Sequence, residues 1–389
     1  MAPQKILYLF DAADWNSRMA VAEGARDKGM DVTIGLINGD DSAKGKAPDF
    51  KVVPLQKQGS NTSIFGGFGL VRDINRLIKE ENPDTIHTVT LKYGFLSALA
   101  AMPYKTKHKI HTLAGLGYLF RSDEAKSTAL RAAMSVPLAQ AFKQSNTTLI
   151  FQNEDDRDLL IQKRIATPDQ SVLIKGSGVH LDQFNAVQGV TKEDEMPIVL
   201  MPTRLVLEKG VGVFIDAARI LKERGVEAKF QIAGGETDNP KAISRDEMIN
   251  MTKDGASEWL GRVEDIPERM AEASLIVFPS YYGEGIPRVL LEACAAGRAI
   301  VTTDNPGCKD AVDHEQNGLI VPIKDPAATA DAIERILGDT ELRERMERNS
   351  RIKAEREFCI ESIVEQTVRV YSDHYESHDH THHKPMPET

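Results

Sequence analysis

Short apolar runs typical of buried strands alternate with helical patterns along nearly all of this 389-residue chain. Strands joined through helices run parallel, because a parallel pair needs a long crossover connection. The first half predicts strands at residues 6–10, 32–36, 51–54, 85–87, 109–112, 148–151 and 171–174. The second half predicts them at residues 198–202, 229–233, 257–260, 275–278, 299–302 and 318–321. We therefore expect an α/β protein of two Rossmann-like domains, whose parallel sheets face an interdomain cleft.

The helical patterns and the length set the domain boundaries. Helices are predicted at residues 17–28, 70–81, 94–102, 125–144, 155–163, 211–224, 266–273, 289–296, 309–312 and 327–337. A further helical run, 341–375, is long enough to pack across both domains. Because the chain exceeds one ordinary core, the expected division is 1–189, 190–365, a returning helix at 366–376 and a disordered tail at 377–389. The tail is rich in histidine, but a metal site there is the weaker alternative.

Charge and cysteine content exclude several classes of function. A net charge of -10 argues against nucleic-acid binding, which needs a basic face. The three cysteines, Cys294, Cys308 and Cys359, share no metal-ligand spacing and fit a reduced, cytoplasmic protein. No window reaches the ~18 to 20 apolar residues of a membrane span. Any membrane contact is therefore expected to be peripheral.

One strand–turn–helix segment carries the strongest functional signal. The apolar run 275–278 is followed by a turn through Gly283 and Gly285, and Pro287 stands where the first turn of a helix is expected. A helix N-terminus offers unpaired N–H groups and a positive dipole end to a phosphate. Glu284 before that end and Glu292 within the helix add carboxylates that suit sugar and ribose hydroxyls. The alternative is a solvated pair of glutamates around an ordinary helix cap.

A second motif follows the first strand of the second half. Arg204 and Lys209 lie in the β–α connection 202–210, where they could hold a diphosphate, the arginine as a planar fork and the lysine as a point charge. Gly210 and Gly212 allow a tight turn. Taken alone, this is also consistent with a routine loop of solvated charges.

In this order and spacing, the two motifs resemble the retaining family-4 glycosyltransferases of the two-Rossmann, B-type fold. The resemblance covers nearly the whole chain and is closest to the bacterial subgroup of N-acetylgalactosaminyltransferases that extend undecaprenyl-diphosphate-linked sugars. Further matching fragments are Pro83–Thr88, Lys92–Gly94, Gly115–Phe120, Phe151–Asp156, Gly176–Val179, Gly261–Asp265 and Thr302–Cys308.

The resemblance implies roles for the residues of the donor site. Arg204 and Lys209 would bind the donor diphosphate and stabilise the leaving nucleotide, while Glu284 contacts the donor sugar and Glu292 the ribose. The catalytic set is thus Glu284, Arg204 and Lys209. The remaining donor contacts are the amides of Gly285, Ile286 and Arg288, with Val263 as a candidate near the base. No metal and no cofactor besides the nucleotide-sugar donor is expected.

The acceptor side departs from the family pattern. Ala114 stands where many relatives carry a catalytic histidine, and His111, three residues earlier, is more typical of a strand-end histidine. No protein base is then evident, which suits a front-face transfer assisted by the departing phosphate. Ser17 is a possible N-cap. The expected acceptor-binding residues are Asn16, Arg18, Lys92, Gly115 and Tyr118, with Lys92 a candidate for the acceptor diphosphate.

The resulting hypothesis is retaining transfer of a hexosyl or N-acetylhexosaminyl group from a nucleotide sugar, most simply UDP-linked, to a polyprenyl-diphosphate-linked sugar in bacterial surface-glycan assembly. The alternatives are a soluble acceptor or a catalytically silent nucleotide-sugar-binding module. Peripheral attachment to the inner face of the plasma membrane would use an apolar loop at 62–70, the cluster Lys105–Lys109 and the segment Lys126–Lys143. The alternative there is an ordinary mobile loop beside solvated lysines.

Overall fold

The computed structural model describes residues 3–55, 64–104, 107–121, 125–184, 196–237, 239 and 241–379. Its contacts divide the chain into two compact units. The first unit consists of three stretches of chain: the residues up to Gly115, Asp123–Ser177 and the residues from Glu361 onward. The segment beginning at Leu116 and the residues Gly178–Ile360 form the second. The predicted α/β class with parallel sheets is confirmed in both units.

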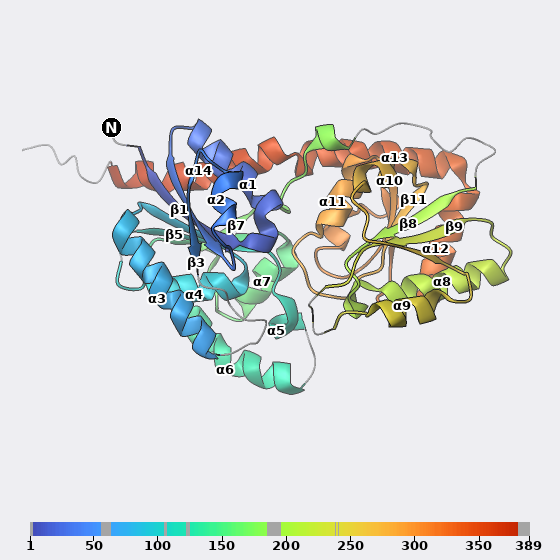
Figure 1. The fold of residues 1–389 in the computed structure, drawn as a ribbon, viewed down its shortest axis with the longest axis horizontal. Coiled ribbons are helices and arrows are strands. Elements are labelled where there is room, and N and C mark those ends of the chain that lie inside the picture. The colour runs from blue at the N-terminus through green and yellow to red at the C-terminus, as the bar shows by residue number, and fades with distance from the viewer. Residues whose placement is uncertain are drawn as a thin grey trace, which may run out of the picture. The chain divides into compact units, whose positions relative to one another are not determined.

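The first unit is built on a seven-stranded sheet in the order β3-β2-β1-β4-β5-β6-β7, in which every neighbouring pair is parallel (Figure 1). Its central strands are almost wholly buried and apolar, as expected of a sheet covered on both faces. The strands are β1 (Lys5–Asp11), β2 (Asp31–Ile37), β3 (Lys51–Leu55), β4 (Thr85–Val89), β5 (His108–Leu113), β6 (Thr147–Phe151) and β7 (Ser171–Leu173).

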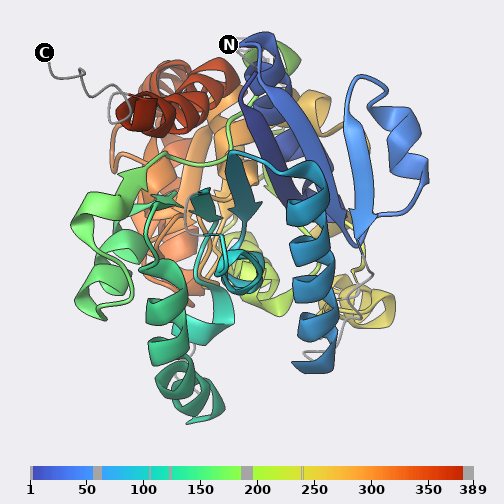
Figure 2. The same ribbon diagram turned by 90° about the vertical axis from the view of Figure 1, so that its left-hand side faces the viewer.

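Two layers of helices cover this sheet. On one face, α1 (Trp15–Asp27) and the C-terminal helix α14 (Ile360–Asp379) pack over β1, β2 and β4. On the other face, α3 (Ile64–Glu81) and α4 (Leu91–Ala101) close a second cluster (Figure 2). The remaining helices are α2 (Ser42–Lys46), α5 (Gly117–Arg121), α6 (Ala125–Phe142) and α7 (Glu154–Gln162). α3 begins at Ile64, so residues 64–68 are helical and the prediction of a loop there is wrong.

The C-terminal helical run is broken where the sequence predicted continuity. α13 (Thr340–Lys353) passes into a π-helical turn at Ala354–Phe358, and Cys359 takes an extended conformation before α14 begins. α14 is then held on the first unit: the Tyr371 hydroxyl lies 2.7 Å from Nδ1 of His87, a buried histidine whose Nε2 lies 2.8 Å from the Thr112 hydroxyl. Burial lowers the pKa of His87 well below its usual range. A neutral imidazole can therefore complete this chain of hydrogen bonds.

The second unit contains a six-stranded parallel sheet in the order β10-β9-β8-β11-β12-β13. Apolar clusters fill both of its faces. Its strands are β8 (Ile198–Pro202), β9 (Lys229–Ala233), β10 (Glu258–Gly261), β11 (Leu275–Phe278), β12 (Ala299–Thr303) and β13 (Gly318–Val321). Its other helices are α8 (Val211–Glu223), α9 (Arg245–Thr252), α10 (Ile266–Glu272), α11 (Arg288–Ala295) and α12 (Pro326–Gly338).

α9 was missed by the sequence reasoning, although it carries a readable signal. Ser244 caps the helix, accepting from the backbone N–H of Glu247, whose carboxylate accepts in return from the N–H of Ser244. This serine with a glutamate three positions later is a capping box. Such a pair could have located the helix.

The division between the units also differs in detail from the sequence estimate. The backbone N–H of Val179 donates to Phe358 at 2.9 Å, and the N–H of Ile360 donates to Val179 at 3.1 Å. These bonds attach the chain from Gly178 onward to the second unit, earlier than the expected boundary at 189/190. That expected boundary lies outside the described residues. Of the tail predicted to be disordered at 377–389, residues 377–379 lie in α14, and the rest lies outside the described residues.

Candidate functional site

Lys209 is positioned by the first β–α connection of the second unit. After β8, the chain passes through a short helical turn at Leu207–Lys209 and reaches Gly210, which has a φ of +84° and begins α8. A Cβ at Gly210 would lie 2.1 Å from the carbonyl oxygen of Pro279. Only glycine therefore fits both the backbone conformation and the space. The tight approach buries Lys209 to 7% exposure beside β11.

Lys209 and Glu284 form an ion pair between the two motifs. The ammonium of Lys209 also lies 5.6 Å from the ring centroids of both Phe278 and Tyr282, within the range of a cation–π contact. The Ser280 hydroxyl lies 3.4 Å from the Glu284 carboxylate. The fold thus brings together a cation and a carboxylate that the sequence had assigned to phosphate and sugar.

Arg204 occupies the same connection but has a different environment. Its side chain is exposed, and within the described part of the chain no hydrogen bond or ion pair engages it. The guanidinium therefore remains available to a ligand. The sequence placed Arg204 beside Lys209 as an equal partner, whereas the structure buries only the lysine.

The loop from Tyr281 to Pro287 is held tightly from β12 and its following turn. Gly307 has a φ of +83°, and a Cβ there would lie 1.6 Å from the carbonyl oxygen of Gly285. The Asn305 amide donates to the carbonyl of Tyr282. A close backbone approach and a side-chain hydrogen bond thus hold the loop in one conformation.

The loop and the start of α11 offer unpaired backbone donors. α11 begins at Arg288, and Pro287 occupies its N-cap without a side-chain capping bond. Among the residues the structure describes, no protein acceptor takes the N–H groups of Gly285, Ile286 and Arg288. Unpaired N–H groups at a helix N-terminus are suited to an anion.

Glu292 lies one turn into α11 and forms an ion pair with Arg288 at 2.7 Å. Its side chain is 17% exposed, and burial raises its pKa while Arg288 acts in the opposite direction. The carboxylate can therefore still accept hydrogen bonds. Val263, the candidate base contact, is half-buried and packs against the adjacent apolar cluster.

The carboxyl edge of the first unit contains a polar cluster that the sequence reasoning did not find. The Asp11 carboxylate accepts from the Asn38 amide at 2.6 Å and from the Tyr93 hydroxyl at 2.7 Å. Asn38 directly follows β2 and Thr90 directly follows β4, and they have φ values of +60° and +77°. Positive φ is unusual for threonine and costs about 1–3 kcal/mol, and such outliers cluster at functional sites. An asparagine directly after a strand was the available signal.

The expected acceptor residues do not all belong to one unit. Asn16 is exposed on α1, whereas Arg18 is buried at 8% exposure. Lys92 is exposed at the start of α4, 5.4 Å from the ring of Tyr93. Gly115 follows β5 with a φ of +93°, and Tyr118 lies in α5, which the contacts assign to the second unit.

Two neighbouring residues have structural roles. Ser17 lies inside α1 and donates to the carbonyl of Asp14, so it is not an N-cap. His111 is fully buried in β5, its Nδ1 lies 2.6 Å from the Thr88 hydroxyl, and burial lowers its pKa to about 3. His111 is therefore a neutral core residue.

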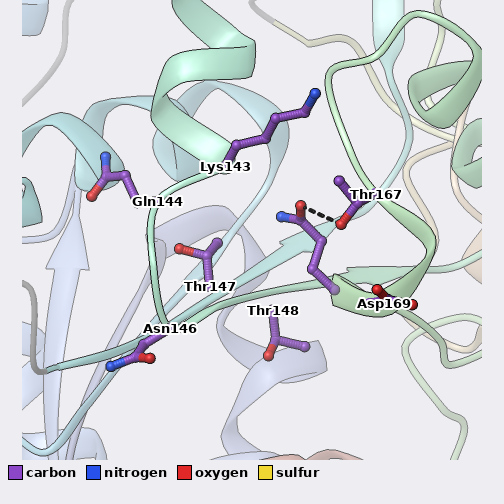
Figure 3. A pocket seen from close by; sticks show the side chains of 8 residues that line it. Lys143, Gln144, Asn146, Thr147, Thr148, Thr167 and Asp169 are labelled. Carbon is purple, nitrogen blue, oxygen red and sulfur yellow. Dashed lines mark hydrogen bonds between the residues drawn. The ribbon is translucent and has the colours of Figure 1, made fainter.

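A hollow of about 430 Å³ lies elsewhere on the first unit (Figure 3). It is lined by the end of α6, the amino end of β6 and the turn at Pro168–Gln170, where Thr167 donates to Gln170 at 2.9 Å. Ligands of open parallel sheets bind at the carboxyl ends of the strands, so we do not place a substrate here. Among the described residues, no group of His, Cys, Asp and Glu could hold a metal ion.

Comparison with known families agrees with this geometry. Residues 5–153 match the family model described as glycosyl transferase 4-like, and residues 182–353 match the model described as glycosyl transferases group 1. The chain belongs to the glycosyltransferases. The second match spans the connection that contains Lys209 and the loop that contains Glu284.

Individual relatives extend along most of the chain. The N,N'-diacetylbacillosaminyl-diphospho-undecaprenol α-1,3-N-acetylgalactosaminyltransferase of Campylobacter jejuni is 27% identical over 87% of this chain and 90% of its own length. The UDP-Gal:α-D-GlcNAc-diphosphoundecaprenol α-1,3-galactosyltransferase of Escherichia coli is 26% identical over 80% and 81%. The solved sucrose-phosphate synthase of Thermosynechococcus elongatus covers 96% of this chain and 100% of that one, with 20% identity and a TM-score of 0.79. This last likeness confirms the B-type fold of the glycosyltransferase.

None of the helices in the described ranges is both long and apolar enough to cross a membrane. Exposed apolar side chains do occur on the first unit, at Phe68 on α3 and at Leu130 and Val136 on α6. The predicted basic cluster is wrong in part: Lys109 is 1% exposed and donates to the carbonyl of Ser145. Lys105, Thr62 and Ser63 lie outside the described residues. In the predicted segment on α6, Leu138 and Phe142 are buried.

Proposed function

We propose that this glycosyltransferase moves a hexosyl or N-acetylhexosaminyl group from a UDP-sugar, with retention, to a polyprenyl-diphosphate-linked sugar in the assembly of a bacterial surface glycan. The observation that carries the proposal is the buried Lys209–Glu284 ion pair beside the unpaired amides of Gly285, Ile286 and Arg288. Cation and amides suit a diphosphate, and the carboxylate suits the sugar attached to it.

The chemistry follows from where charge develops. As the bond between the anomeric carbon and the diphosphate oxygen breaks, negative charge grows on the leaving phosphate. Lys209, Arg204 and the N-terminus of α11 supply the opposite charge at that point. The acceptor hydroxyl then bonds to the anomeric carbon, and its proton passes to a departing phosphate oxygen. This route needs no protein base, in keeping with Ala114 after β5 and the buried, neutral His111.

The donor and acceptor classes are supported by the names of the relatives. The Escherichia coli relative uses UDP-galactose, and both curated relatives act on sugars linked to undecaprenol through a diphosphate. We extend both features to this chain because the matches cover most of its length.

Radiolabelled transfer provides the direct test. The purified protein is incubated with UDP-linked hexoses and N-acetylhexosamines, and with GDP-linked counterparts, in the presence of a polyprenyl-diphosphate-linked N-acetylhexosamine. We expect labelled lipid with a UDP donor and tighter calorimetric binding of UDP than of GDP. Tighter GDP binding would contradict the donor assignment, and transfer only to free sugars would replace the lipid acceptor with a soluble one. Binding with neither transfer nor donor hydrolysis would indicate a silent module.

We also propose peripheral attachment of the first unit to the inner face of the plasma membrane. Phe68 is 69% exposed and Val136 is 63% exposed, and apolar insertion is one of the two signals that hold a protein at a bilayer. The buried Lys109 does not contribute to the basic signal. Replacing Phe68 and Val136 with Ser should weaken sedimentation with anionic vesicles. The matched control is Ile249→Ser, an apolar side chain 51% exposed on the second unit. Equal binding by all three proteins would contradict this attachment.

Catalysis without a divalent metal is the final part of the proposal. Lys209, Arg204 and the α11 N-terminus occupy the role that a metal would otherwise have at the leaving diphosphate. Transfer should therefore persist in excess EDTA. Loss of activity in EDTA with recovery on adding Mg²⁺ or Mn²⁺ would overturn it.

A further inference from the structure

Arg18 on α1 is a buried cation that forms no ion pair with the part of the chain that the structure describes. Its side chain is 8% exposed, and its Nε atom is enclosed without a hydrogen-bond partner. Within the described ranges, no carboxylate forms an ion pair with its guanidinium. The arginine guanidinium is a permanent cation in proteins. Burying such a charge without a partner is strongly unfavourable unless something else compensates it.

The position of Arg18 places this charge at the carboxyl edge of the sheet. Arg18 lies in the first turn of α1, and side chains on a helix lean toward its N-terminus. Trp15 and Met19, on either side of it, pack in the same cluster as Ala114 at the end of β5. The guanidinium therefore lies near the strand ends where ligands of parallel sheets bind.

The groups that face Arg18 from β1 and β4 are neutral. Burial raises the pKa of Tyr8 to about 12, and burial lowers the pKa of His87, so neither supplies a negative charge near pH 7. The positive charge of Arg18 opposes the rise in the pKa of Tyr8 and adds to the fall in the pKa of His87. The carboxylate of Asp14, the N-cap of α1, is a negative charge near these groups and adds to the rise in the pKa of Tyr8.

We propose that Arg18, with the first turn of α1, forms a phosphate-binding subsite of the first unit that holds a phosphate group of a substrate. A planar guanidinium pairs with two phosphate oxygens at once, and the adjacent helix N-terminus favours the same charge. The diphosphate of a lipid-linked acceptor is one source of that group, and the donor nucleotide is the other. This inference rests on the proposed function, since it names how one of its substrates is held.

The test compares two acceptors that differ only in phosphate. One is a short polyprenyl-diphosphate-linked N-acetylhexosamine, and the other is the octyl glycoside of the same sugar. The variants are Arg18→Gln, Arg18→Lys and the matched control Arg26→Gln. Arg26 is on the same helix but exposed, paired with Asp27 and Asp49. KM and kcat are measured for each acceptor, and UDP affinity by calorimetry.

We expect Arg18→Gln to raise KM for the diphosphate-linked acceptor by about tenfold or more, the effect of losing a hydrogen bond to a charged group. KM for the octyl glycoside and the affinity for UDP should stay at the parental values. Arg18→Lys should recover part of the loss because it restores the charge without the fork. Arg26→Gln should change none of these quantities.

The outcomes are distinguishable. A raised KM for the nucleotide donor with unchanged acceptor kinetics would keep the phosphate subsite and assign it to the donor. Equal losses with both acceptors, or a lowered melting temperature as the only change, would overturn the subsite and leave Arg18 a structural residue. If the parent protein transfers to neither acceptor, the proposed function fails instead, whatever the variants do.

Discussion

Charged side chains at the carboxyl edges of the two sheets differ in the partners that the protein gives them. In the second unit each charged pair is completed within the protein, Lys209 with Glu284 and Arg288 with Glu292. In the first unit Asp11 accepts from the neutral donors of Asn38 and Tyr93, while no carboxylate of the described residues forms an ion pair with Arg18. The second unit thus pairs its buried cation within the protein, whereas the anion that we propose for Arg18 would come from a substrate.

The loops at the two carboxyl edges are also held in different ways. The second unit relies on glycines that admit close backbone approach, Gly210 against Pro279 and Gly307 against Gly285. At the carboxyl edge of the first unit's sheet, two residues other than glycine, Asn38 and Thr90, have positive φ values instead. Glycine contacts fix a backbone with little dependence on neighbouring side chains, so the donor loop can be recognised from its own sequence. A polar cluster depends on residues from three separate strand ends.

The largest effect should come from removing one carboxylate at each edge. Glu284→Gln is expected to lower turnover by ~10² to 10³-fold, as for the loss of a transition-state contact. Its UDP affinity should be unchanged or higher, because Lys209 loses a competing partner. Asp11→Asn should instead act through KM for the acceptor. Steady-state kinetics measures turnover and the acceptor KM of both variants, and calorimetry measures their affinity for UDP. A fall in UDP affinity in Asp11→Asn would contradict the difference expected between the two edges.

Within the donor edge, the two cations should differ. Lys209→Met is expected to weaken UDP binding by ~10 to 100-fold, corresponding to the 1.5–3 kcal/mol of a hydrogen bond to a charged group. Arg204→Met should weaken UDP binding less, because the guanidinium that it removes is exposed and screened by water. Calorimetry with UDP and with uridine is the measurement. Parental uridine binding by both variants is the control, and an equal loss for uridine would indicate misfolding.

The glycine contacts can be tested against a matched position. Gly29→Ala, at a φ of +82° with open space around it, should cost ~1–2 kcal/mol of stability from backbone strain alone. Gly307→Ala has a nearly identical φ but meets the carbonyl oxygen of Gly285, so it should lower the melting temperature further and weaken UDP binding. Equal thermal shifts for the two variants would show that close backbone approach is not what holds the donor loop.

The smallest effect concerns pH. Burial raises the pKa of Glu292, so its carboxylate is protonated at a higher pH than an ordinary glutamate. UDP affinity should fall a few-fold, about the value of one hydrogen bond, as the pH drops through this raised pKa. The stability that this group contributes has the opposite sign: it is present below the unfolded pKa and is lost as the pH rises through the folded pKa. In Glu292→Gln the affinity step should disappear, and a persisting step would assign it elsewhere.

Much of the fold could be predicted from the sequence, and so could the motifs of the proposed donor site. The apolar runs that became β1 to β13 predicted parallel sheets, because each run had to be buried and each crossover needed a helix. The donor motifs were readable because glycine, proline and charge occupy fixed offsets from a single strand end. Helix α9 was missed even though its capping box was present.

The sequence alone therefore determined the strands, most of the long helices and the glycosyltransferase class it resembled, since these depend on neighbours a few positions away, whereas the donor residues it named stay a prediction. Only the tertiary structure decided which cation is buried, that Lys209 pairs with Glu284, that Lys109 is unavailable to a membrane, and that Asp11, Asn38 and Tyr93 form one cluster. It also decided that Arg18 is buried without an ion pair to any carboxylate of the described ranges. The physical reason is that burial and pairing depend on distances through space between residues on different strands, and those distances exist only once the sheets have formed.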